Sequence, residues 1–157
     1  MTEVNGLRLA YRGFVTGIAG AYVWAAIAMA LAGLLFGDPL APLRPVATAI
    51  TPLAGTPELA FVLGLAAVQL GGALVGMCFA YFFARFFTVR RTLSLAGPTA
   101  AVLVWALLVA AFEQIGRTVP LELQLIGAVA AVGFGLVLGA GVPVRGEVTR
   151  YSGSAST

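Results

Sequence analysis

Few side chains in this sequence could act in catalysis or bind a metal. Histidine, the most versatile side chain for both, is absent. The 157 residues include no histidine and a single cysteine, Cys78. Without an imidazole there is no His ligand for haem, chlorophyll-type pigments or zinc, and no His general base. One thiol can form neither an intramolecular disulfide nor a thiolate metal cluster. We therefore expect the protein to bind no cofactor and no metal.

One group of charged side chains is expected to gather at the end of the bundle opposite the two termini. Glu113 and Arg117 follow an apolar stretch, and Asp38, Arg44 and Glu58 are expected at the same level. Two carboxylates could in principle do acid–base work, but no nucleophile, base or metal ligand accompanies them. We therefore predict structural ion pairs and no enzyme. The specific hypothesis is that Arg44 pairs with Glu113 and clamps the segment around Arg44 over the helices.

Gln69 is the polar side chain placed most deeply in an apolar stretch. A carboxamide in a membrane interior is expected to bond to another helix, which is worth on the order of 1 kcal/mol. The alternative is that Gln69 lines a cavity. We favour the packing contact.

Composition assigns the chain to a class of protein. Apolar residues make up 61% of it and charged residues only 10%, whereas soluble domains are about half apolar and a quarter charged. About 20 consecutive apolar residues cross a bilayer as a helix. We predict an all-α integral membrane four-helix bundle in a single domain, residues 1–150, with a disordered tail, 151–157. The predicted helices are about 13–36, 58–87, 96–115 and 121–142.

The first of these stretches resembles a secretory signal peptide in its basic start and small residues, but its apolar run is longer than is typical. The segment 38–57 after it contains five prolines and is too polar and broken to span. Within it, residues 45–51 are expected to form one or two helical turns lying at the membrane interface, with Pro45 at the first position.

Arginine positions predict the orientation. All nine basic residues are arginine. Seven lie in the N-terminal segment, the connection after the second predicted helix and the C-terminal segment, and two, Arg44 and Arg117, lie in the other connections. Because cytoplasmic loops carry the excess of basic residues, we predict a multi-pass protein of the inner (plasma) membrane with both termini cytoplasmic. The net charge of +3 is then a topology signal, so no nucleic-acid partner is expected.

Glycines recur four residues apart in several helices, a spacing that allows two backbones to approach closely. These pairs predict either a homodimer face or ordinary packing within the bundle, and we favour packing. The candidate helix-packing residues are Gly13, Gly17, Gly72, Gly76, Gly135 and Gly139.

The run Pro42-Leu43-Arg44-Pro45-Val46-Ala47 lies between two glycine-rich helices, and this pattern resembles a group of small uncharacterised bacterial membrane proteins. The resemblance implies a four-helix bundle and no particular activity. From the residues themselves we expect a non-catalytic membrane protein, an accessory subunit or scaffold that packs against partner helices in a homo-oligomer or larger complex. The alternative is a small oligomeric transporter or channel.

Overall fold

The computed structural model describes residues 6–51, 56–83 and 90–142, which form five helices and their connections. They are α1 (Gly6–Phe36), α2 (Arg44–Ile50), α3 (Pro57–Phe83), α4 (Arg90–Gln114) and α5 (Leu121–Gly141). All except the short α2 are long and apolar enough to cross a membrane. The predicted fold class, four membrane-length helices with a short helix between the first two, is confirmed, and the chain is a multi-pass membrane protein.

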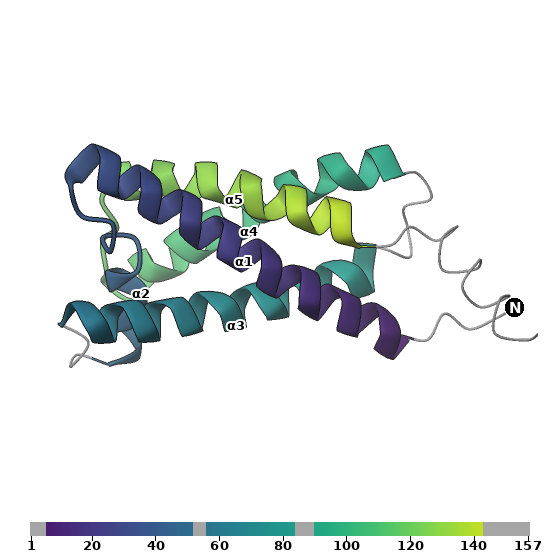
Figure 1. Cartoon of the computed structure of the whole chain (residues 1–157), viewed down its shortest axis with the longest axis horizontal. Helices are drawn as coiled ribbons and strands as arrows, with labels where there is room; N and C mark the ends of the chain where they lie inside the picture. The colour runs from purple at the N-terminus through teal and green to yellow at the C-terminus, as the bar shows by residue number, and fades with distance from the viewer. Residues whose placement is uncertain (1–5, 52–55, 84–89, 143–157) are drawn as a thin grey trace, which may run out of the picture.

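The long helices pack in the order α3, α1, α5, α4. α1 packs against both α3 and α5, while α4 packs on α5 and α2 packs on α3. Figure 1 shows α1 crossing the bundle obliquely, close to α3 near the N-terminus and separated from it at the other end, where α2 lies. Among the described residues, α3 and α4 share no extensive contact. They are therefore the two edges of the bundle. The end that holds α2 and residues 115–120 is called the α2 end below.

α1 begins earlier than predicted, at Gly6 and not at residue 13. Arg8 and Arg12 lie within its first two turns and are exposed. The prediction was wrong because apolar composition marks where a chain crosses a membrane, whereas a helix can continue beyond the membrane when its polar side chains are solvated.

α4 also begins earlier than predicted, at Arg90 and not at residue 96, so Pro98 lies inside the helix. Proline removes one backbone donor, which usually marks a helix start or a break. Membrane helices tolerate such a proline where neighbouring groups compensate. The predicted end of the second long helix, at residue 87, and the predicted tail lie outside the described residues.

Two glycines end helices in a conformation that other residues rarely adopt. Gly37 follows α1 with φ +70°, and Gly116 follows α4 with φ +74°. Beyond α4, the N–H of Arg117 donates to the carbonyl of Phe112 and the N–H of Gly116 to that of Glu113. This is the Schellman arrangement, which satisfies the last carbonyls and reverses the chain. The predicted end of the first helix at residue 36 is confirmed.

Backbone contact between glycines joins α1 to α3. A Cβ added at Gly17 would overlap the carbonyl oxygen of Gly72 and lie 2.9 Å from its carbonyl carbon, and one added at Gly76 would lie 2.7 Å from the Cα of Gly17. Gly13 lies one turn away, where an added Cβ would lie 2.7 Å from the Cβ of Ala80. Any side chain at these positions would force the two helices apart.

The α4–α5 interface follows the same pattern. A Cβ at Gly135 would lie 2.5 Å from the carbonyl carbon of Gly97, and one at Gly139 would lie 2.8 Å from the Cα of Ser94. The glycine pairs of α1, α3 and α5 singled out in the sequence therefore pack against helices of the same chain.

Two adjacent glycines of α3 allow a matched test of this packing. At Gly72 an added Cβ would lie 2.8 Å from the carbonyl oxygen of Gly17, whereas at Gly71 it meets nothing within 4 Å. Both substitutions to alanine gain helix propensity, about 1 kcal/mol, but only the one at Gly72 overpacks an interface, which costs typically 1–3 kcal/mol.

We therefore expect Gly72→Ala to lower the free energy of unfolding in detergent, and Gly71→Ala to leave it unchanged or raise it. Thermal unfolding of both variants measures the difference. Equal effects would contradict a backbone contact at Gly72.

Candidate functional site

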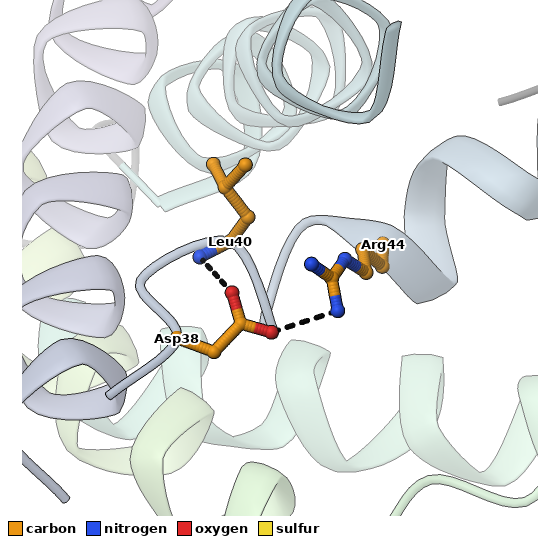
Figure 2. A network of polar contacts seen from close by, with 3 residues as sticks. All are labelled: Asp38, Leu40 and Arg44. Atoms are coloured by element: carbon orange, nitrogen blue, oxygen red, sulfur yellow. Dashed lines mark hydrogen bonds and ion pairs between the residues drawn. The ribbon is translucent and has the colours of Figure 1, made fainter. Parts of the chain in front are cut away.

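The polar contacts of the described chain are concentrated at the α2 end. After α1, the Asp38 carboxylate accepts a hydrogen bond from the N–H of Leu40 (3.1 Å) and pairs with the Arg44 guanidinium (2.7 Å) at the start of α2 (Figure 2). Both charged side chains are partly solvated, with 48% of Arg44 and 34% of Asp38 exposed. An ion pair with that much solvent is worth at most about 1 kcal/mol. The ion pair orders the turn that leads into α2, and it occupies the Arg44 guanidinium with Asp38.

Arg117 joins α2 to the connection between α4 and α5. Its Nη1 donates to the hydroxyl of Thr48 (3.1 Å) and its Nη2 to the backbone carbonyl of Thr48 (3.0 Å). The same hydroxyl donates to the carbonyl of Arg44 (2.9 Å). The turn at Gly116 places Arg117 where it can reach back to α2. Arg117 thus makes a two-pronged, charge-assisted contact between segments 69 residues apart.

The predicted pair of Arg44 with Glu113 is not formed. Arg44 pairs with Asp38, and Glu113 is exposed in the last turn of α4. The physical reason is sequence proximity, because a helix that starts at Arg44 presents this residue to the turn just before it. The link that the sequence assigned to Arg44 and Glu113 is made by Arg117 and Thr48. Arg117 was singled out in the sequence as a charge at this level, but nothing there indicated Thr48 as its partner.

Gln69 lies midway along α3, about 18 Å from the start of the helix. Its amide nitrogen and oxygen are both buried and have no hydrogen-bond partner within residues 6–51, 56–83 and 90–142. The next turn of the helix holds Gly72 and Ala73, which contact Gly17 of α1. The amide therefore lies just beyond the point where α1 and α3 cross. The structure does not give Gln69 the bond to another helix that the sequence predicted.

Two tryptophans fill the centre of the bundle, and sequence reasoning missed them. Trp24 of α1 donates its indole N–H to the carbonyl of Gly127 (3.1 Å), and Trp105 of α4 donates to that of Gln124 (2.9 Å). Their rings lie 5.5 Å apart between centroids, and Trp105 occupies the space that a side chain at Gly127 would need. A buried indole needs an acceptor, so two tryptophans within apolar spans are a signal that the sequence offered.

No metal-binding group was found among residues 6–51, 56–83 and 90–142: nowhere do three or more His, Cys, Asp or Glu side chains come together. Comparison of the chain with protein-family models, curated proteins and solved structures found no match. The resemblance to small bacterial membrane proteins therefore identifies no family, and the site is interpreted from its own geometry.

The contacts at the α2 end predict which charge matters for stability. Arg117→Ala removes both hydrogen bonds to Thr48. One hydrogen bond to a charged group contributes at most about 1.5–3 kcal/mol to the free energy of unfolding. We expect Arg117→Ala to lower the free energy of unfolding in detergent by about 1–2 kcal/mol. Glu113→Ala, a charge change at an exposed residue at the same end, should change it by less than about 0.5 kcal/mol.

The double variant Arg44→Ala/Glu113→Ala is the control, because two residues without a shared contact should have additive effects. Strong non-additivity, together with a large effect of Glu113→Ala alone, would support the Arg44–Glu113 pair and contradict the pairing of Arg44 with Asp38.

Proposed function

We propose that this chain is a non-catalytic integral membrane protein, an accessory subunit or scaffold that packs against partner helices. The observation that carries the proposal is the amide of Gln69, which has no hydrogen-bond partner among the residues that the structure describes. An unpaired amide in a membrane interior is costly, and association with another polypeptide can relieve that cost. Its position on α3, an edge helix of the bundle, supports this interpretation.

The other polar groups of the described chain support a structural role. Arg44 and Arg117 hold α2 in place, and both tryptophans donate to helix carbonyls. These groups are committed to contacts within the fold. In contrast, α3 lies at an edge of the bundle and exposes Val62 and Leu70. Such a face suits lipid or the helices of a partner.

A small oligomeric transporter or channel is the second candidate. It is favoured by the same residue, because a carboxamide halfway along a membrane-length helix could face a path for a polar solute. Solute uptake into liposomes that contain the purified chain distinguishes the two functions. Flux above that of empty liposomes would favour the second candidate.

The subunit proposal predicts a complex in the native membrane. Extraction of the tagged chain with its surrounding lipid, followed by native mass spectrometry, should give an assembly heavier than the 16.1 kDa chain. Ala66→Trp, on the exposed side of α3, should reduce the assembled fraction, and Ala106→Trp, on the exposed side of α4, serves as the matched control. A chain that is monomeric in its native membrane would overturn the proposal.

The proposal includes an orientation, with both termini and the α3–α4 connection in the cytoplasm of a bacterial cell and the α2 end outside. It rests on the seven-to-two arginine distribution. Single cysteines in a Cys78→Ser background test it. We expect Thr56→Cys and Thr118→Cys to react with an impermeant thiol reagent added to whole cells, and Thr92→Cys to remain protected. Labelling of Thr92→Cys with protection of Thr56→Cys would show the opposite orientation.

A further inference from the structure

The amide of Gln69 has no hydrogen-bond partner among the described residues of its own chain. Its nitrogen and oxygen are both buried. If the side chain turned outward, the amide would meet lipid tails, which offer neither donor nor acceptor. Neither arrangement pairs the amide with a described residue of its own chain.

The side of α3 next to Gln69 is open towards the α2 end. Val62 and Ala66 precede Gln69 by two turns and one turn, so they lie on nearly the same side of the helix, and both are exposed. Gln69 itself is partly exposed, so rotation about its side-chain bonds can bring the amide to this surface. The small side chain of Ala66 allows another helix to approach there.

A second copy of the chain is the partner whose polar group matches Gln69 both in chemistry and in depth within the membrane. A carboxamide carries donors and an acceptor, so two of them can form a reciprocal pair of hydrogen bonds. Two copies related by a twofold axis along the membrane normal place Gln69 at the same depth in each. A partner of another sequence would need its own polar group at that depth.

We infer that two copies of this chain associate through the Val62–Gln69 side of α3, and that the Gln69 amides pair across the twofold axis. The inference rests on the proposed function, since it names the partner against which the chain packs. It gives Gln69 two states, buried and unpaired in the monomer and outward and paired in the dimer.

The test uses the purified full-length chain in liposomes of phosphatidylethanolamine and phosphatidylglycerol, with the monomer–dimer equilibrium measured by energy transfer between labelled copies. We expect the chain to dimerise and Gln69→Met, which keeps the shape and removes the amide, to weaken the dimer about tenfold. Ala66→Trp should abolish the dimer, whereas Ala106→Trp on the far edge should leave it unchanged.

The melting temperature of the monomer distinguishes a dimer contact from a structural contact within one chain. Loss of an amide that stabilises the monomer would lower this temperature. Because the amide is unpaired in the monomer, Gln69→Met should leave the melting temperature of the detergent-solubilised monomer unchanged or raised. A lowered melting temperature with an unaffected dimer would make Gln69 an intrachain contact and overturn the inference.

Two further outcomes separate failure of the dimer from failure of the proposed function. A chain that stays monomeric in these liposomes but forms a complex in its native membrane would refute the dimer and leave the proposed function in place. A chain that is monomeric in both would refute both proposals.

Discussion

The rest of this structure depends on the contact between the backbones of α1 and α3 at Gly13, Gly17, Gly72 and Gly76. Helices within lipid gain little from the hydrophobic effect when they associate, because lipid tails are as apolar as their side chains. Close packing must therefore supply the stabilisation, and an added Cβ at Gly17 would lie 2.9 Å from the carbonyl carbon of Gly72. This contact brings α1 into the centre of the bundle.

The other interfaces build outward from that crossing. Phe134 of α5 lies at the junction, since added Cβ atoms at Gly20 and Gly72 would lie 2.7 Å and 3.3 Å from its ring. α5 is thereby held on the other side of α1, and α4 follows by its own glycine contacts with α5. At the α2 end, where α1 and α3 diverge, α2 packs against α3 and Arg117 holds it. Gln69 lies between these two regions and alone keeps a buried, unpaired side-chain amide among the described residues.

The sequence predicted much of the fold because membrane insertion makes simple demands on composition. Four apolar stretches and the proline at residue 45 were enough to predict four membrane-length helices and the short α2. The starts of α1 and α4 were missed, since solvated turns such as that of Arg8 carry no apolar signal and a proline such as Pro98 usually marks a helix start. Glycine spacing identified packing positions but not their partners, because the spacing is the same whether a helix meets its own chain or another copy.

The polar contacts were harder to predict because they depend on where turns direct each side chain. Arg44 is captured by Asp38 just before α2, and Arg117 reaches Thr48 only because the chain reverses at Gly116. Neither of these two contacts can be predicted from the charge and the membrane depth of the arginine alone. The depth of Gln69 was evident from the sequence, whereas its lack of a partner emerged only from the packed bundle.

The most direct measurement of the central contact is nuclear magnetic resonance of the chain in lipid nanodiscs with isotope-labelled glycine. The α-protons of Gly17 should show cross-peaks to those of Gly72 and Gly76, since an added Cβ at Gly76 would lie 2.7 Å from the Cα of Gly17. Gly71, on the other side of α3, should show none to α1. Absence of both Gly17 cross-peaks from a folded sample would contradict the crossing on which this structure is built.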